Sequence, residues 1–210
     1  MSIHELAAKI ASHLALELKY DHLHEVRMTF GLELFLDEII KLICLITISY
    51  ILSLLPEVLI ITATAGILRL ASGGEHCSEY YRCLIGGTMC FMLLGWAVHY
   101  FSPMLGQQEL FLVALLSFLI AEIALWKYAP RDTENKPITE EKDKIKYKKW
   151  SLSIAAVYFI IMMIFSAVTT LNLITLAIAV GMLEQVFTVT PWGYRFLRFI
   201  DHILDFNKVG

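Results

Sequence analysis

The sequence predicts an all-α, polytopic integral membrane protein: a bundle of about six transmembrane helices with an N-terminal amphipathic interfacial helix. Apolar residues make up 58% of the chain and charged residues only 18%, whereas soluble domains are nearer half and a quarter. The apolar residues also form blocks, near 39–55, 57–71, 84–102, 109–126, 151–169 and 171–190. Several blocks approach the roughly 20 residues that cross a bilayer core, and backbone in hydrocarbon must bond internally, which favours helices.

Residues 1–30 are expected to form the interfacial helix rather than a cleavable signal peptide, because they contain no continuous apolar segment. Apolar side chains recur there at helical spacing, with charged or polar ones between them: Ile3, Leu6, Ile10, Leu14 and Leu18 against Glu5, Lys9, His13 and Glu17. This pattern is typical of a helix in the membrane interface, and equally of one packed against the protein's own cytoplasmic face.

Residues 31–190 are predicted to form one membrane-embedded domain, with a basic loop at 127–149 and a tail at 191–210. The block 57–71 is short, so it is expected to be tilted, partial or re-entrant. The loop is rich in Lys and Arg, whereas the links near Pro56, 102–108 and 169–173 contain none. The positive-inside rule therefore makes the loop cytoplasmic. Counting spans outward places both termini and the segment 69–83 on the same face of the cell membrane.

The segment 69–83, RLASGGEHCSEYYRC, gathers the most reactive side chains. A Cys thiolate is a good nucleophile, and a nearby His can take its proton. His76 and Cys83 are seven residues apart, about 10.5 Å along a straight helix, which is too far for direct contact. The chain must therefore fold back between Gly73 and Arg82, or the contact forms only with substrate. On spacing alone, an unreactive loop histidine and a packed cysteine are the better explanation.

The four cysteines do not predict a metal site or a disulfide. His76, Cys77 and Cys83 could supply ligands, but no CxxC pair is present and a fourth ligand would have to come from afar, so no metal or other cofactor is expected. Cys77 and Cys83 would face a reducing cytoplasm, which disfavours a structural disulfide. Cys44 and Cys90 lie inside apolar blocks, where a cysteine is usually a small buried hydrophobe.

Two motifs resemble the accessory gene regulator protein B family, the membrane cysteine endopeptidases of bacterial peptide quorum sensing. The first is Arg69-x-x-Ser72-Gly73-Gly74-x-His76, followed by Cys83. The second is Ala129-Pro130-x-Asp132-Thr133-x-Asn135-Lys136-Pro137-Ile138, which resembles the stretch after that family's fourth span. Size, hydropathy and the amphipathic N-terminus are similar along most of the chain.

The resemblance implies that Cys83 is the nucleophile and His76 its general base. The substrate would be an AgrD-type precursor peptide, cut on the C-terminal side of the future signal through an acyl-enzyme thioester. An internal Cys or Ser of the precursor would then close a thiolactone or lactone ring, giving the autoinducing peptide. A helix that starts near Ser78 would place Cys83 near its positive end and favour the thiolate.

Further residues are expected to contact the substrate: Arg69, Ser72, Gly73, Gly74, Lys136 and Glu184, the last as an acid within an apolar block. Ser72, Glu75 and Glu79 are candidates to orient His76, and the sequence does not rank them. Membrane lipids are expected partners, family members are thought to form homodimers, and no nucleic acid is expected.

The alternative from another class is a small membrane transporter or a non-catalytic scaffold. Lys41, Glu122 and Glu184 would then mark a solute path through the membrane. The sequence has no inverted repeat and no matching pair of Gly- or Pro-broken spans, which argues against a transporter. A peptidase should have one thiol that reacts much faster than the others, and a transporter should not.

Overall fold

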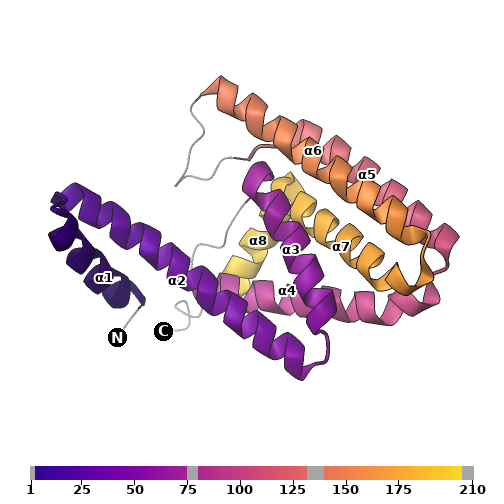
Figure 1. The fold of residues 1–210 in the computed structure, drawn as a ribbon, viewed down its shortest axis with the longest axis horizontal. Helices are drawn as coiled ribbons and strands as arrows, with labels where there is room; N and C mark the ends of the chain where they lie inside the picture. Colours follow the sequence, from indigo (N-terminus) through magenta and orange to yellow (C-terminus); the bar gives the residue numbers. More distant parts are fainter. Residues whose placement is uncertain (1–2, 75–79, 132–139, 205–210) are drawn as a thin grey trace. The chain divides into compact units, whose positions relative to one another are not determined.

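The computed structural model describes residues 3–74, 80–131 and 140–204, and its regular elements within these ranges are all helical (Figure 1). Five helices in them are long and apolar enough to cross a membrane: α3 (Leu55–Ser72), α4 (Tyr80–Phe101), α5 (Gln107–Tyr128), α6 (Glu141–Ser166) and α7 (Asn172–Val189). Short 3-10 turns, Ser102–Met104 and Thr169–Leu171, join α4 to α5 and α6 to α7. The expected all-α polytopic bundle is confirmed.

The first predicted apolar block falls on α2 (His22–Ile51), which is not one of these five helices. The reason is local charge: Asp37, Glu38 and Lys41 lie close to the apolar stretch, and Lys41 Nζ pairs with Glu38 Oε1 at 2.6 Å. Only the last turns of α2 are continuously apolar. The short block 57–71, by contrast, belongs to an 18-residue helix, α3, that is long enough to span.

The chain divides into two compact units, Met1–Ile48 and Ser49–Gly210. In the smaller unit α1 (Ile3–Leu18) folds back along α2, and His4 Nδ1 lies 2.9 Å from Glu33 Oε2 (Figure 1). The start of α2 is capped by Asp21, whose carboxylate accepts the His24 backbone N–H at 2.9 Å. That bond, reinforced by the His24 side chain, lowers the pKa of Asp21.

The buried face of α1 is a row of small residues, Ala7, Ala11 and Ala15. The larger apolar side chains behave differently, because Leu14, Leu16 and Leu18 are exposed. Within the expected range 1–30, α1 covers Ile3–Leu18 and α2 begins at His22. Both sequence-based interpretations, the membrane interface and packing on the protein's cytoplasmic face, stay predictions.

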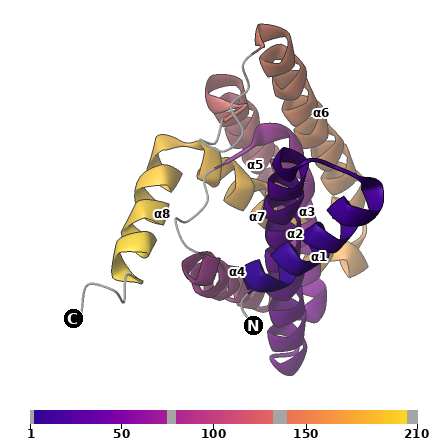
Figure 2. The ribbon, with the colours of Figure 1, turned by 90° about the vertical axis from the view of Figure 1, so that its left-hand side faces the viewer.

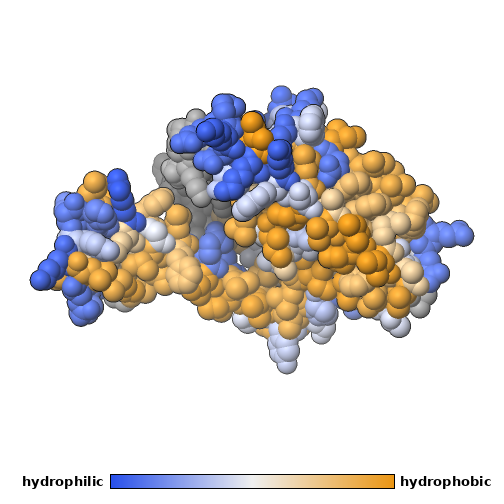
Figure 3. Space-filling model, turned by 45° about the horizontal axis from the view of Figure 1, so that its top comes forward, coloured by the Kyte–Doolittle hydropathy of each residue, from blue (hydrophilic) through white to orange (hydrophobic). Residues whose placement is uncertain are grey.

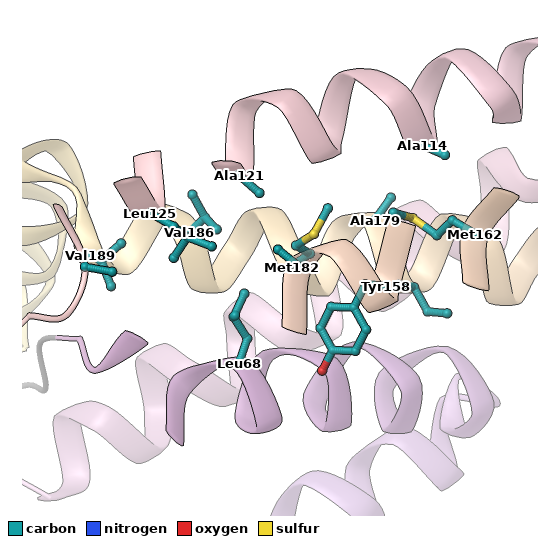
Figure 4. Close-up of a cluster of buried hydrophobic side chains, with 13 residues drawn as sticks. Leu68, Ala114, Ala121, Leu125, Tyr158, Met162, Ala179, Met182, Val186 and Val189 are labelled. Carbon is teal, nitrogen blue, oxygen red and sulfur yellow. The ribbon is translucent and has the colours of Figure 1, made fainter. Parts of the chain in front are cut away.

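In the larger unit α7 lies at the centre, packed against α3 and α5, and α5 also packs against α6. A core of buried side chains fills the space between these helices, including Leu68, Leu125, Met162 and Met182 (Figure 4). Tyr158 of α6 donates its hydroxyl hydrogen to the Thr64 carbonyl of α3 at 3.0 Å, so this buried hydroxyl is satisfied.

Small residues allow the helices to approach closely. A Cβ built on Gly181 of α7 would lie 2.6 Å from the Ile61 carbonyl oxygen of α3. Close approach through glycine, alanine and serine is the usual way in which membrane helices associate. On α5 the buried residues form one face: Leu110, Ala114, Ser117, Ala121 and Leu125.

Both ends of the basic segment 127–149 are helical, because α5 continues to Tyr128 and α6 begins at Glu141. Lysine and glutamate are good helix formers, and Lys144 Nζ pairs with Glu141 Oε1 at 3.2 Å. Figure 3 shows hydrophilic side chains gathered toward the start of α6 and apolar side chains over much of the visible face of this unit. Lys148 Nζ lies 5.0 Å from the centre of the Trp126 ring, an arrangement typical of a membrane interface.

The last helix, α8 (Pro191–Ile203), leaves the bundle at the end of α7 (Figure 2). Thr190 caps it by accepting the Gly193 backbone N–H at 3.1 Å, and Pro191 occupies the first helical position. A Cβ on Gly193 would collide with the Phe187 carbonyl oxygen, so the turn between α7 and α8 is tight. Helix α8 packs on both α7 and α4.

Candidate active site

Two glycines, Gly73 and Gly74, follow the C-terminal end of α3. Gly73 has φ +68° and Gly74 has φ +144°, conformations that favour glycine. The Gly73 N–H still donates to the Arg69 carbonyl at 2.9 Å, and α3 stops at Ser72. Because α3 ends at Ser72 and neither Gly73 nor Gly74 is helical, no single helix carries both halves of the first motif. The expected interruption at Gly73–Gly74 is confirmed.

The two sequence motifs meet at Gly73. The Arg131 N–H donates to the Ser72 carbonyl at 2.9 Å, and Gly73 and Arg131 form a parallel β-bridge. A Cβ on Gly73 would collide with the Arg131 carbonyl oxygen. Gly73 therefore needs to be glycine both for its backbone conformation and for the approach of the second motif.

Gln185 of α7 holds this turn from the other side. Its side chain is 1% exposed, and its amide NH2 donates to Ser72 Oγ at 2.9 Å and to the Gly73 carbonyl at 2.7 Å. Its amide oxygen accepts from Arg69 Nη1 at 3.3 Å. Gln185 thus joins three of the residues that the sequence nominated. Gln185 itself was not nominated. A polar side chain inside the apolar block 171–190 could have indicated it, as it did for Glu184.

Glu184 lies beside Gln185 on α7 and is partly buried. It is close enough to Arg69 to interact with it electrostatically, and close enough to Cys90 of α4 to do the same. The acid is therefore part of the polar cluster at the end of α3, rather than an isolated charge. Its expected contact with substrate stays a prediction.

Gly74 is enclosed by the same cluster. A Cβ on Gly74 would lie 2.9 Å from Thr188 Oγ1 and 3.1 Å from Arg69 Nη1. The Thr188 hydroxyl itself donates to the Gln185 carbonyl at 2.8 Å. The structure thus brings together Arg69, Ser72, Gly73, Gly74 and Glu184 around Gln185.

Cys83 lies on the first turn of α4 and is half-buried. Its neighbours tie this turn to α8, because Tyr81 donates its hydroxyl hydrogen to the Leu204 carbonyl at 3.1 Å. Arg82 Nη1 lies 3.6 Å from Asp201 Oδ1, and Arg82 Nε donates to the Tyr81 hydroxyl at 3.0 Å. The position of Cys83 therefore depends on α8 as well as on α4.

Several expected site residues lie outside the described ranges: Glu75, His76, Cys77, Ser78, Glu79 and Lys136. The distance from His76 to Cys83, the residue that orients His76 and the cap at Ser78 therefore stay predictions. Within the described ranges Cys44, Cys83 and Cys90 are thiols, and no three His, Cys, Asp or Glu residues are grouped to hold a metal ion.

Comparison with known proteins identifies the family. The family model described as Accessory gene regulator B matches residues 4–189. The chain belongs to the accessory gene regulator B family. It is 31% identical over 208 residues to an AgrB-like protein of Clostridium perfringens strain SM101, covering 95% of this chain and 96% of the relative. It is 27% identical over 186 residues to accessory gene regulator protein B of Staphylococcus aureus strain MRSA252, covering 89% and 93%. No solved structure matches the chain.

Membership in the accessory gene regulator B family supports a role in the quorum-sensing system for which the family is named. The family is associated with an AgrD-type precursor peptide and with maturation of the autoinducer. With five apolar helices of spanning length among the described residues, the chain is a multi-pass membrane protein.

Proposed function

We propose that this accessory gene regulator B protein is a membrane cysteine endopeptidase that matures an autoinducing peptide from an AgrD-type precursor. The observation that supports it most is the meeting of the two family motifs, with the Arg131 N–H on the Ser72 carbonyl. His76 belongs to the segment that connects this junction to α4, whose first turn carries Cys83. The proposed base, His76, and the proposed nucleophile, Cys83, are thus only seven residues apart in the sequence.

In the first proposed step the Cys83 sulfur attacks the scissile carbonyl carbon of the precursor. His76 takes the thiol proton and passes it to the leaving nitrogen as the C–N bond breaks. The products are a thioester between Cys83 and the N-terminal fragment, and a free C-terminal tail with a new amino group.

In the second step an internal Cys or Ser of the precursor attacks the thioester carbonyl, and Cys83 leaves as a thiol. Hydrolysis of a thioester is downhill, whereas exchange of one thioester for another is nearly balanced, so water must be kept from the intermediate. A site at the face of a membrane bundle, with Ser72 and Gln185 buried beside it, fits that need.

The remaining proposed roles concern the turn at the end of α3. Backbone N–H groups near Gly73 and Gly74 are proposed to stabilise the oxyanion of the tetrahedral intermediate. Arg69, held by Gln185, is proposed to contact a peptide carboxylate, and Lys136 and Glu184 to contact the precursor. The site and both termini are proposed to face the cytoplasm, because the Lys- and Arg-bearing links fall on that side.

The proposed function is tested by reconstituting the full chain in liposomes with the peptide encoded by the short reading frame expected beside its gene. Cys83→Ala should abolish release of the C-terminal tail, measured by mass spectrometry, and His76→Ala should lower kcat by roughly 10²–10⁴. Cys90→Ala, on the same helix, and Cys44→Ala are the matched controls and should keep most activity. Full cleavage by Cys83→Ala would contradict the proposal.

A further inference from the structure

Helix α8 presents a stripe of exposed apolar side chains. Trp192, Phe196, Phe199 and Ile203 are 70%, 46%, 58% and 55% exposed. Their spacing of four, three and four residues places them on one face of the helix. Exposed apolar residues are ordinary when single, but four in a row along one helix form a binding surface.

Basic residues follow the same stripe along one edge. Arg195, Arg198 and His202 are exposed, and the helical spacing places them beside the apolar residues rather than opposite them. The Arg195 guanidinium lies 5.3 Å from the centre of the Trp192 ring, so the cation and the aromatic ring share one surface.

The other face of α8 is already occupied within the protein. The Tyr194 ring lies under the Arg131 guanidinium, 4.6 Å from its central carbon. Asp201 faces Arg82 of α4, and a Cβ on Gly86 of α4 would lie 3.0 Å from Ile200 Cγ2. These contacts fix the rotation of α8 about its own axis, and the apolar stripe points away from them.

We propose that α8 is an interfacial helix whose stripe binds an anionic bilayer surface. The helix begins at the residue after the Thr190 cap, so no linker separates it from the end of the spanning helix α7. It therefore starts at the level of the bilayer surface. Aromatic and aliphatic side chains beside arginines suit this level, because the rings enter the headgroup region while the cations meet lipid phosphates.

A second copy of the chain fits this surface less well. An antiparallel two-fold contact made through the same stripe would bring the Arg195 and Arg198 edges of both copies together, where like charges repel. An anionic bilayer instead offers opposite charge along the whole length of the helix.

Lipid binding by α8 would also hold the first turn of α4 at the membrane surface. The Tyr81–Leu204 hydrogen bond and the Arg82–Asp201 pair transmit the position of α8 to the two residues that precede Cys83 in the sequence. Only this consequence rests on the proposed function, because binding of lipid by the stripe requires no peptidase activity.

The test uses the full chain with Trp96, Trp126 and Trp150 replaced by Phe, which leaves Trp192 as the reporter. The protein is reconstituted in mixed phosphatidylglycerol and phosphatidylcholine vesicles in which one lipid or the other is brominated. Brominated phosphatidylglycerol should quench Trp192 at least about twofold more strongly than brominated phosphatidylcholine at equal fraction, since arginines near the membrane surface attract anionic headgroups.

Arg195→Gln/Arg198→Gln should remove this lipid preference, and Arg195→Lys/Arg198→Lys should keep it. Lys19→Gln/Arg27→Gln removes the same charge elsewhere and is the matched control, which should behave like the parent. Equal quenching by the two lipids in the parent would overturn the proposal. A second outcome would also overturn it: neither lipid quenches Trp192, and the Trp192 emission changes with the protein-to-lipid ratio. A second copy of the chain would then cover the stripe. No precursor is needed, so this outcome is independent of cleavage.

Discussion

The two ends of α3 are each built around one buried polar side chain, but the chemistry differs. At the C-terminal end, the neutral amide of Gln185 donates two hydrogen bonds and accepts a third. At the N-terminal end, Glu57 is 1% exposed, and its Oε1 lies 2.7 Å from His99 Nδ1. The other carboxylate oxygen, Oε2, is buried with no hydrogen-bond partner among the described residues.

The amide of Gln185 fixes the backbone at one end of α3, whereas the carboxylate of Glu57 at the other end depends on a single partner. A fully satisfied buried amide costs little and specifies one conformation, which suits the turn at Gly73. A buried carboxylate with one bond relies on that bond, and here the partner His99 has a side chain that is 60% exposed. The C-terminal end of α3 is therefore rigid by construction, and the N-terminal end is sensitive to one residue.

The largest effect is expected from Gly73→Ala. The new Cβ would meet the Arg131 carbonyl oxygen and would require an unfavourable backbone conformation, so the junction of the two motifs should separate. We expect a loss of at least about 3 kcal/mol in the free energy of unfolding, measured in detergent, together with loss of activity. Gly66→Ala, within α3, places its Cβ where nothing lies within 4 Å and is the matched control. Equal stability of the two variants would refute the close approach.

The next largest effect is expected from Gln185→Leu, which keeps the size of the side chain and removes its hydrogen bonds. The Ser72 hydroxyl, the Gly73 carbonyl and one Arg69 N–H would each lose a partner, at a cost of about 2–4 kcal/mol. Ser72→Ala removes only one of these bonds and should cost about 1 kcal/mol. If chemical denaturation showed the two variants to be alike, the amide would not be the organising group.

At the opposite end of α3, His99→Phe should cost about 2 kcal/mol, because it leaves the Glu57 carboxylate buried without its partner. Adding Glu57→Gln to that variant should recover about half of the loss, since the buried charge is then gone. A double-mutant cycle on thermal unfolding measures this coupling. Strictly additive losses would show that the two residues do not depend on each other.

The smallest effect is expected from Asp201→Asn, which sets the scale of an ordinary ion pair in this protein. Arg82 is buried and Asp201 is partly buried, but their closest atoms are 3.6 Å apart and Arg82 keeps its hydrogen bond to the Tyr81 hydroxyl. The loss should therefore be only about 0.5–1 kcal/mol. A loss as large as that of Gln185→Leu would mean that α8 contributes as much to the site as α7 does.

The spanning helices could be predicted because their signal is local: α3 to α7 each follow an apolar block of the sequence. The start of α6 could not, since Lys142–Lys149 favours a helix and a basic loop equally well by composition. The first apolar block was also ambiguous, because the charges around Lys41 interrupt it.

For the site, the sequence identified the residues of one motif but not what holds them. Arg69, Ser72 and Gly73 were nominated from a short segment, whereas Gln185 reaches Ser72 across 113 positions of the chain. Arg131 belongs to the second motif, yet no pattern predicted that its backbone would bond to Ser72. Such partners depend on how helices pack, which periodicity does not determine.

The approach of Gly181 to the Ile61 carbonyl has a mechanical consequence. Helices α3 and α7 cannot slide or rotate freely against each other at this distance. Either movement of α7 would drive the side chain of Val180 or Met182 into the backbone of α3. The pair is stiff, and the turn at its end is stiff with it. Helices α4 and α8 are joined instead through side chains, by the 3.1 Å bond of Tyr81 and the 3.6 Å pair of Arg82. Under the proposed function, the precursor would therefore be received by a stiff turn that lies next in sequence to the helix carrying Cys83.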